Sequence, residues 1–401
     1  SSPSPECMDH GTDNVMFVVV ARGDGATAHA VLKSQGWLDK RVEPIEVSED
    51  TIGFPVVVSV PQERLESSMK APFDLVERLA VIRPPVDPHE RLNAVAVSWV
   101  SRFAADHQAV LDHLPVKWEK LGDLVLLPAE SMRHAAWDGV RQHEHAPTLW
   151  KQMAHALQAD ALGVQHPIAS DTLRSSQVEM LLGSSNVRFL DHGVTFAFDA
   201  AKVMFSSGNN TERRRIGDLD MTGETVVDAY AGVGYYTLPM LVRSRADRVH
   251  ACELNPDSIN GLLEGAALNG VADRLTVHEG DNAETLVKLR GVADRCHLGL
   301  LPSSEAVWEA CLLALKPSGG TLHVHMNVEE ERLDSWCSAT VERFRNLVEH
   351  HALAFVVTVS HLEKVKWFAP RVRHVVLDLR FRPEASLTGE RPRPPAPSPL
   401  P

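Results

Sequence analysis

Cysteine is scarce in this chain and long hydrophobic runs are missing, and each shortage excludes a class of protein. Five of the 401 residues are cysteine, and no two of them form a Cys-x-x-Cys pair. Such scatter indicates reduced, buried thiols in a cytoplasmic protein and argues against a disulfide framework or a cysteine zinc site. The longest apolar runs, at residues 15–21 and 56–60, have the length of strands, whereas a membrane span needs about 20 apolar residues.

Positive charge is also in short supply. The chain carries 53 acidic and 40 basic residues, a formal net charge of −13. This excess of acid argues against a general polyanion binder, although one RNA could still be bound through a local basic face. Residues 1–5 lack the apolar core of a signal peptide, and whether Ser1 is the true start stays open. We expect a cytoplasmic protein with no membrane partner.

The chain does contain a strand, a glycine turn and a helix in direct succession. Residues 225–228, Thr-Val-Val-Asp, have the pattern of a buried parallel strand that ends at Asp228. Gly232 and Gly234 follow, and a helical pattern begins at Thr237. Glycines at such a turn let the backbone approach a ligand. The absence of Gly-Lys-Ser/Thr excludes a P-loop, and the absence of a third small residue favours S-adenosylmethionine over NAD.

Polar side chains also follow the next two predicted strands. Residues 248–253 end at Glu253, about 20 residues after the glycine turn, where a Rossmann-type site holds a ribose. Residues 274–279 lead into Asp281 and Asn282. Because parallel strands bring their carboxyl ends to one edge of a sheet, we predict a nucleoside site that contacts ribose and adenine. A fourth strand is predicted at 297–302 and a fifth at 320–325.

These patterns predict an α/β fold: a class I S-adenosylmethionine-dependent methyltransferase domain, Rossmann-like and seven-stranded, preceded by smaller α/β regions. Two closing strands, at 353–360 and 372–381, are predicted with residues 361–370 as their connection. Earlier in the chain we predict a strand at 54–60 and helices at 89–107 and 149–162. The expected divisions are a disordered N-terminus (1–14), a small α/β region (15–85), a mixed α/β substrate-recognition domain (86–204), the S-adenosylmethionine-binding catalytic domain (205–382) and a disordered proline-rich tail (383–401).

Several motifs, taken in order, resemble the family of tRNA wybutosine-synthesizing protein 2. They are Phe-Ser-Ser-Gly-Asn-x-Thr-Glu at 205–212, the segment 228–239 with its glycine turn, Cys-Glu-x-Asn-Pro at 252–256, Gly-Asp-Asn at 280–282 and Leu-Gly-Leu-Leu-Pro-Ser-Ser-Glu at 298–305. The resemblance implies transfer of the 3-amino-3-carboxypropyl group of S-adenosylmethionine to carbon 7 of the tricyclic 4-demethylwyosine base of tRNA(Phe). Methylthioadenosine would be released in this step of wybutosine biosynthesis.

The segment that separates this reaction from methyl transfer is the loop after the fourth strand. Related methyltransferases carry Asn/Asp-Pro-Pro there, and its polar groups hold the target nitrogen against the methyl. In this chain Leu301 stands at the acid or amide position and Ser303 replaces the second proline. We therefore take Pro302, Ser303 and Ser304 as candidate residues of the target loop. No general base can be named.

The resemblance also implies roles for the cofactor-binding residues. Glu253 would hold the ribose, Asp281 and Asn282 the adenine, and Ser206 and Arg213 would lie near the methionine end. Arg213 stands where some relatives have lysine, and either cation could pair with the cofactor carboxylate. Asp228 is expected to position the site, with Gly232 and Gly234 forming the turn. No metal and no obligate protein partner are expected.

Other interpretations of some residues stay open. The basic residues Arg214, Arg215, Lys364, Lys366 and Arg371 either contact RNA or form ordinary solvated faces. His323-x-His325 and His143-x-His145 resemble parts of a metal site, but no third ligand accompanies them. The nearest rival function is a tRNA guanine methyltransferase with the same cofactor. A binding subunit with a vestigial cofactor fold and a small-molecule methyltransferase are further alternatives.

Overall fold

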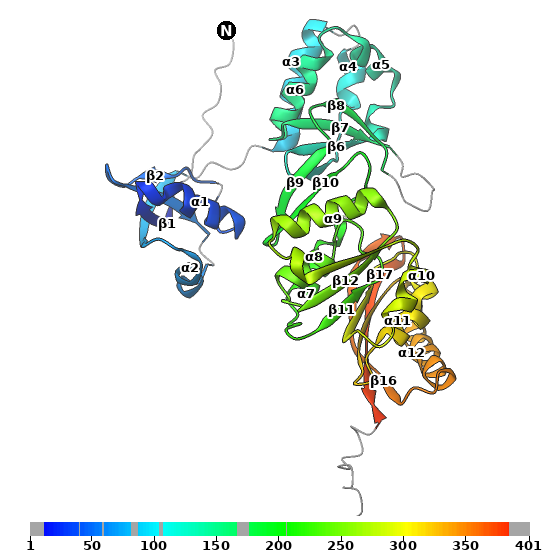
Figure 1. The fold of residues 1–401 in the computed structure, drawn as a ribbon. Coiled ribbons are helices and arrows are strands. Elements are labelled where there is room, and N and C mark those ends of the chain that lie inside the picture. The colour runs from blue at the N-terminus through cyan, green and yellow to red at the C-terminus, as the bar shows by residue number, and fades with distance from the viewer. Residues whose placement is uncertain are drawn as a thin grey trace, which may run out of the picture. The chain divides into compact units, whose positions relative to one another are not determined.

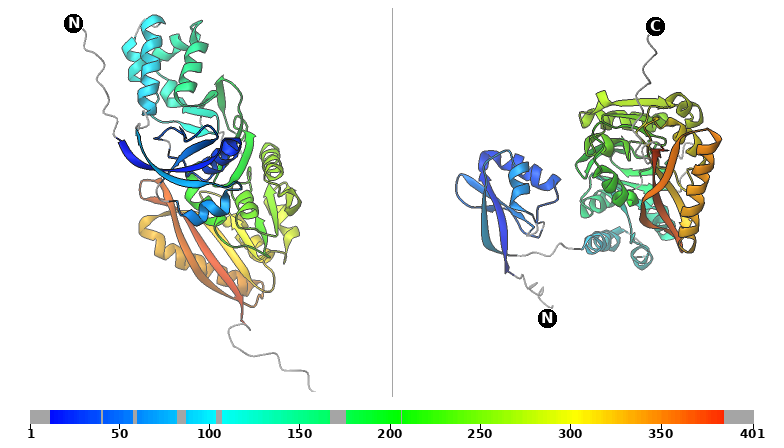
Figure 2. Two further views of the ribbon diagram at one scale, coloured as in Figure 1. Left: turned by 90° about the vertical axis from the view of Figure 1, so that its left-hand side faces the viewer. Right: turned by 90° about the horizontal axis from the view of Figure 1, so that it is seen from below.

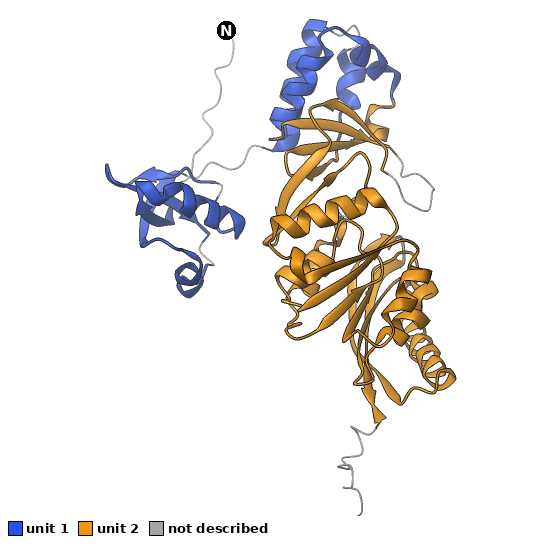
Figure 3. Cartoon of the chain, in the orientation of Figure 1, with its two compact units in different colours: residues 1–116, 134–158 blue, residues 117–133, 159–401 orange. Residues whose placement is uncertain are grey.

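The computed structural model describes residues 12–39, 41–57, 60–81, 87–103, 107–166, 176–205 and 207–384 (Figure 1). The chain divides into two compact units, one of residues 1–116 and 134–158 and the other of residues 117–133 and 159–401 (Figure 3). The expected boundaries near 86 and 205 do not coincide with the borders of these units, and the functional division stays a prediction. Most of the two expected disordered ends lies outside the described residues.

Unit 1 begins with an antiparallel sheet in the order β2-β3-β1-β4. Alternate residues of β1 point to opposite faces, so that Val18 and Val20 pack with helix α1 while Phe17 and Val19 lie in a second cluster. The strand predicted at 54–60 is confirmed in its first half, and β4 was not predicted. The elements are β1 (Thr12–Ala21), α1 (Gly25–Ser34), β2 (Ile45–Glu46), β3 (Thr51–Val56), α2 (Gln62–Ser68) and β4 (Asp74–Val81).

The remainder of unit 1 is helical, and it contains α3 (Pro88–Phe103), α4 (His107–Asp112), α5 (Ala135–Gln142) and α6 (Ala146–Ala156). The apolar spacing that predicted a helix at 89–107 is confirmed by α3. The helix predicted at 149–162 is wrong in its second half, because α6 ends at Ala156 and Gln158 has a φ of 57°. A left-handed residue ends a helix, and the apolar residues that follow form a strand.

Unit 2 opens with the sheet β5-β6-β7-β8, made of β5 (Glu119–Leu121), β6 (Leu124–Pro128), β7 (Ala161–Gln165) and β8 (Val178–Leu182). A hairpin of β9 (Asn186–Asp191) and β10 (Val194–Asp199) follows and packs against helix α9. His192 and Gly193 form the turn between the two strands, with φ values of 48° and 80°. The strand β9 before it was not predicted.

The predicted seven-stranded sheet is confirmed, in the order β13-β12-β11-β14-β15-β17-β16 (Figure 1). Five strands are parallel, and β17 is inserted antiparallel between β15 and β16. The strands are β11 (Thr225–Asp228), β12 (Arg248–Glu253), β13 (Leu275–Glu279), β14 (Arg295–Leu298), β15 (Gly320–Glu329), β16 (Phe355–Ala369) and β17 (Val372–Pro383).

Helices cover both faces of this sheet (Figure 1). One face packs on α10 (Asn282–Thr285), α11 (Trp308–Ala314) and α12 (Leu333–His350) through an apolar core that includes Cys296, Leu298 and Val324. The other face packs on α7 (Asn210–Gly217), α8 (Thr237–Val242) and α9 (Pro256–Leu268). Because side chains alternate along strands, His297 and His325 point to the α7 face.

The last two strands differ from the prediction in length. Residues 361–370 were predicted as a connection, but β16 continues to Ala369 and the turn to β17 is two residues long. Figure 2 shows this long hairpin near the C-terminal end of the colour range. Most of the added residues are exposed or only partly buried, so they carry no apolar pattern that a sequence could reveal. No helix among the described residues is long and apolar enough to cross a membrane.

Candidate functional site

The glycine turn after β11 has the conformation that only glycine adopts easily. Gly232 and Gly234 have φ values of 54° and 93°. A Cβ atom on Gly232 would lie 2.3 Å from the ring of Tyr235, and one on Gly234 would lie 2.6 Å from Leu238. Asp228, fully buried at the end of β11, accepts hydrogen bonds from the Thr237 hydroxyl at 2.8 Å and from the Tyr230 N–H at 3.3 Å. These contacts fix the turn at the carboxyl edge of the sheet.

The acids expected to bind a nucleoside lie at this same edge. The carboxylate of Glu253 accepts hydrogen bonds from the backbone N–H groups of Gly232 (2.7 Å), Leu254 (3.0 Å) and Asn255 (2.8 Å). Burial raises the pKa of Glu253, against the opposite effect of these bonds. A carboxylate has about four acceptor positions, so one of them stays available to a ribose hydroxyl. This geometry fits a ligand bound across the turn.

The two residues predicted to bind adenine begin helix α10. Asp281 caps the helix by accepting the Ala283 N–H at 2.8 Å, and its side chain is exposed. Asn282 donates from Nδ2 to the carbonyl of Ala229 at 3.1 Å, which ties it to the residue after β11. The sheet therefore brings Glu253, Asp281 and Asn282 to one edge, as the sequence predicted from their positions after the strands.

The region predicted for the methionine end of the cofactor lies at the start of α7. Ser206 falls outside the described residues. Arg213 is 3% exposed, pairs with Asp191 at 3.0 Å and lies 4.8 Å above the ring of Phe205. Asp191 belongs to the β9–β10 hairpin, so this hairpin helps to build the site. Asp191 already neutralises the guanidinium of Arg213. Arg213 therefore does not need the carboxylate of the cofactor to balance its charge.

Arg215, one of the candidate RNA-contact residues, is instead engaged in ion pairs within the protein. Its guanidinium donates to both oxygens of Glu212 at 2.7 Å and to Asp378 at 2.7 Å, and its side chain is only 16% exposed. Burial raises the pKa of Glu212 despite this pairing. For Asp378 burial acts in the same direction, but His323 and Arg215 outweigh it and lower the pKa. Arg215 therefore anchors α7 to the sheet.

The target loop, residues 301–305, is attached along β15. Pro302, after a cis peptide bond, accepts the Asn327 N–H at 2.9 Å, and Ser303 forms a bridge with Met326. Ser304 is fully buried, donates its hydroxyl to the carbonyl of His325 at 3.1 Å and accepts the Trp308 indole N–H at 3.1 Å. Ser304 thus holds the loop in place, whereas Pro302 is exposed and Ser303 is partly exposed at the carboxyl edge.

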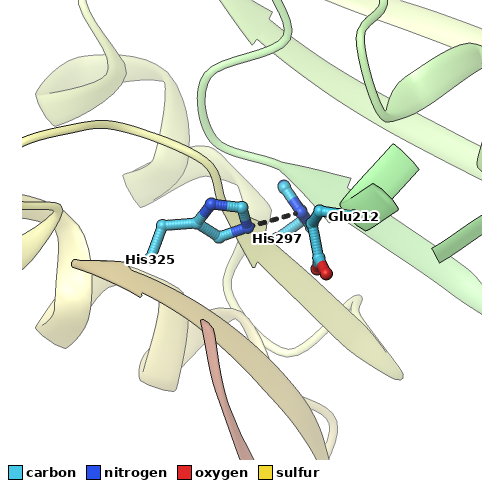
Figure 4. Close-up of side chains that lie close together, drawn as sticks. All are labelled: Glu212, His297 and His325. Atoms are coloured by element: carbon cyan, nitrogen blue, oxygen red, sulfur yellow. Dashed lines mark hydrogen bonds between the residues drawn. The ribbon is translucent and has the colours of Figure 1, made fainter. Parts of the chain in front are cut away.

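A buried histidine cluster lies on the α7 face of the sheet, and its convergence was not predicted. His297 and His325 share a hydrogen bond of 3.0 Å between their Nε2 atoms, with Glu212 beside them (Figure 4). His325 continues through Nδ1 to His374 Nε2, also at 3.0 Å. Burial lowers the pKa of His325 well below its usual value and that of His374 to about 4. His325 and His374 are therefore neutral at neutral pH.

Glu212, His297 and His325 have the residue types and spacing of a metal site. The structure thus supplies further ligands for the His323-x-His325 motif. However, both Glu212 oxygens are bound by Arg215, and the two Nε2 atoms satisfy each other. These groups fit a hydrogen-bonded network without an ion, and the expectation of no metal stays a prediction.

The other residues predicted to contact RNA lie in different settings. Arg214 is 65% exposed on α7, and Lys364 pairs with Glu330 at 3.0 Å on the surface of β16. Arg371 is exposed in the β16–β17 turn. Trp367 and Phe368, at 52% and 57% exposure, lie between these two cations in the sequence. This combination of cations and aromatic rings suits contact with nucleic acid.

Lys366 lies apart from that surface. It is partly buried, and its Nζ would be 2.7 Å from a Cβ on Gly208, in the segment before α7. Burial lowers the pKa of Lys366, and the nearby Arg213 adds to the effect. Among the described residues no carboxylate forms an ion pair with it. This position could not be predicted from the sequence, where Lys366 resembles the other cations near it.

The sheet order, the glycine turn and the polar residues after the first three strands define a class I S-adenosylmethionine-dependent methyltransferase fold. Residues 188–356 match the family model described as the TRM5/TYW2 methyltransferase domain. A protein of Danio rerio described as "tRNA wybutosine-synthesizing protein 2 homolog" is 36% identical over 394 residues, covering 88% of this chain and 95% of that protein. The chain belongs to the tRNA wybutosine-synthesizing protein 2 family.

Two further comparisons extend this result. "tRNA wybutosine-synthesizing protein 2/3/4" of Arabidopsis thaliana is 41% identical over 276 residues, covering 69% of this chain. The match spans only 27% of that longer plant protein. Among solved structures, P. horikoshii TYW2 in complex with MeSAdo superposes with a TM-score of 0.57 at 27% identity, over 72% of this chain and 99% of that one.

Proposed function

We propose that this chain transfers the 3-amino-3-carboxypropyl group of S-adenosylmethionine to carbon 7 of the tricyclic 4-demethylwyosine base beside the anticodon of tRNA(Phe). The observation that carries the proposal is the target loop. Leu301 stands where methyltransferases of related type place an acid or amide, and Ser304 is turned inward to Trp308 and β15. A loop without that polar group does not hold a target nitrogen against the methyl carbon.

The reaction exchanges one bond for another. Carbon 7 of the base attacks the γ-carbon of the methionine portion, the bond from that carbon to sulfur breaks, and the sulfur keeps the electron pair. Methylthioadenosine leaves, and carbon 7 loses its proton. The sulfonium supplies three activated carbons, and the geometry of the site selects one. A tenfold preference for one carbon needs only about 1.4 kcal/mol of transition-state free energy. The relative bound to MeSAdo supports this product.

We assign the nucleoside half of the cofactor to the edge formed by β11, β12 and β13. Glu253 accepts a ribose hydroxyl through its remaining acceptor position, and Gly232 keeps the backbone open beside it. The free side of the Asp281 carboxylate and the amide of Asn282 receive the adenine. Asp228 is a positioning residue, because both of its oxygens are used to hold the turn.

For the carboxylate of the cofactor we favour Lys366 over Arg213. Arg213 is paired with Asp191, whereas the ammonium of Lys366 is partly buried beside Gly208 without an acidic partner among the described residues. A cation in such a place gains most from an anion that arrives with the ligand. Lys366 and the segment before α7 would together fix the methionine portion, which is the part that is transferred.

For the RNA we propose the exposed face of the β16–β17 hairpin, with Lys364, Arg371, Trp367 and Phe368, together with Arg214 on α7. The surface ion pair of Lys364 with Glu330 is weak, so a phosphate can replace the carboxylate. A local face of this kind explains how a protein with a net charge of −13 binds one RNA selectively.

The test of the function is a label split. The protein is incubated with tRNA(Phe) that carries the tricyclic precursor and with S-adenosylmethionine labelled in either the methyl or the carboxyl carbon. Carboxyl label in the RNA without methyl label supports the proposal. Methyl label alone makes the chain a tRNA methyltransferase. Neither label, with cofactor binding demonstrated separately, makes it a binding protein.

A further inference from the structure

The side-chain amide of Asn327, on β15, has no hydrogen-bond partner among the described residues. Both its nitrogen and its oxygen are buried. An amide carries two donors and an acceptor oxygen, and leaving all of them unpaired in a buried place is costly. Buried polar groups are nearly always paired in folded proteins, so an unpaired amide indicates a group that arrives with a ligand or a water.

The backbone places Asn327 beside the target loop. β14 ends at Leu298, which pairs with Val324, so the rest of β15 extends beyond the carboxyl edge of β14. There the Asn327 N–H donates to the carbonyl of Pro302 at 2.9 Å. Ligands of open α/β sheets bind outside the carboxyl ends of the strands. Asn327 therefore lies at the edge of the sheet where ligands of this fold bind.

The side chain of Asn327 also has an unpaired neighbour. His374 is directly opposite Asn327 in the register of β15 and β17, which brings their side chains together on the α7 face. His374 is fully buried, and its Nδ1 has no partner among the described residues although its Nε2 is bonded to His325. Three buried polar atoms at one place thus stay unused: Asn327 Nδ2, Asn327 Oδ1 and His374 Nδ1.

We infer that Asn327, with His374 beside it, recognises the acceptor base by hydrogen bonds to the polar edge of its heterocycle. This inference rests on the proposed function and assigns a residue to its specificity. The loop has lost the polar group that holds a target nitrogen, since Leu301 takes that position. Asn327 carries a side-chain amide on the adjacent strand, where its backbone N–H binds the carbonyl of Pro302 in the same loop.

The chemistry of this pair suits a neutral heteroaromatic edge. A carboxamide presents a donor and an acceptor side by side, the pattern with which asparagine reads the edges of bases. Burial lowers the pKa of His374 to about 4, so its ring is neutral and offers no charge to a phosphate. The pair is therefore better matched to a base than to the RNA backbone or to the cofactor carboxylate.

The experiment compares Asn327→Leu and Asn327→Asp with the wild-type protein in the carboxyl-label transfer assay. The matched control is Asn346→Asp, the same change at an exposed position on α12. The kcat/KM for the precursor tRNA, the Kd for S-adenosylmethionine and the melting temperature are measured for each variant. We expect kcat/KM to fall roughly 10- to 100-fold in both Asn327 variants, the loss of one bidentate contact to a base, with the cofactor Kd unchanged.

Three results would overturn the inference. Folded Asn327 variants with wild-type kcat/KM would show that a water satisfies the amide, and a parallel loss of cofactor affinity would assign Asn327 to the cofactor. A fall of equal size in Asn346→Asp would show that the effect is not specific. If Asn327→Leu does not fold, Asn327→Asp decides, because it keeps the size of the side chain. If the wild-type protein transfers no carboxyl label, the proposed function itself is wrong. That result is distinguishable from the comparison of the variants.

Discussion

Arg215 and Asp378 form an ion pair of 2.7 Å between helix α7 and strand β17, 163 residues apart in the chain. Arg215 also binds Glu212 on its own helix, and Asp378 accepts from His323 Nδ1 at 2.6 Å. His323 in turn accepts from Arg295, which pairs with Glu224. One connected polar network therefore fixes the helix that follows the predicted methionine-binding segment.

The first prediction concerns this anchor. Arg215→Met leaves Glu212 and Asp378 buried without their cation, and breaking a buried pair costs about 3–5 kcal/mol. Urea unfolding should show a loss of that size. Arg214→Met, at the adjacent but 65% exposed arginine, should change stability by no more than about 0.5 kcal/mol. Equal effects of the two substitutions would contradict the anchoring role.

The second prediction concerns pH. Burial lowers the pKa of His323 and of His374 to about 4, below the usual 6.5. The unfolded chain takes up these protons below pH 6.5 and the folded chain only near pH 4. Stability is therefore complete above pH 6.5 and falls between 6.5 and 4, by about 1.4 kcal/mol per pH unit for each such histidine.

Urea midpoints measured from pH 7.5 to 4.5 check this slope. His374→Gln should reduce the slope of stability against pH by the contribution of one histidine, about 1.4 kcal/mol per pH unit. His350→Gln, at an exposed position on α12, should leave the slope unchanged. A flat profile in the wild-type protein would refute the prediction.

The third prediction concerns the glycine turn. Gly232→Ala should abolish measurable binding of S-adenosylmethionine, because its Cβ would lie 2.3 Å from the Tyr235 ring that packs the turn. Gly223→Ala is the matched control: its φ of 81° carries similar backbone strain, but nothing lies within 4 Å of the new Cβ. Equilibrium dialysis with labelled cofactor should show near wild-type affinity for the control. Loss of binding in both variants would assign the effect to folding.

The fourth prediction concerns Lys366. Lys366→Met should weaken S-adenosylmethionine binding about 10-fold or more, the usual value of a hydrogen bond to a charged group. Decarboxylated S-adenosylmethionine should bind wild type and variant equally, since it lacks the proposed partner. Lys364→Met, two residues away and paired with Glu330, should leave both affinities unchanged. An unchanged preference for the carboxylated cofactor in Lys366→Met would exclude this assignment.

The fifth prediction concerns the RNA surface. Arg371→Glu combined with Trp367→Ala should lower affinity for tRNA and make it less dependent on salt, because fewer phosphate contacts release fewer counterions. Filter binding across a range of salt concentrations measures both quantities. Arg332→Glu, at a 74% exposed arginine before α12, is the control. If the double variant bound tRNA with wild-type affinity and wild-type salt dependence, this face would not be the RNA-binding surface.

The central sheet was predictable because its strands are buried on both faces. Thr225–Asp228 and Arg248–Glu253 are short apolar segments with a polar residue at the end, and parallel topology alone brings those ends together. The strands that were missed lie at edges or on the surface: β4 has few buried residues, and most of the second half of β16 is exposed or only partly buried. Their conformation depends on pairing with a neighbour, which leaves little hydrophobic periodicity in the sequence.

The polar half of the site was not predictable for a different reason. His297, His325 and His374 belong to three strands that become neighbours because β17 is inserted beside β15. Asn327 and Lys366 acquire their positions from that same arrangement and from the attachment of the target loop. The sequence contains each of these residues as an ordinary polar side chain, and only tertiary packing turns them inward.

The β9–β10 hairpin also limits where this chain can be recombined with a related chain. Phe205, the first residue of the expected catalytic domain, stacks on Phe198 of β10 with ring centroids 5.4 Å apart, and Arg213 depends on Asp191 of β9 for its charge balance. A recombination point placed at residue 205 would separate two halves of one hydrophobic core. A chimaera made from this chain is therefore expected to need the hairpin together with the seven-stranded sheet, whatever regions precede them.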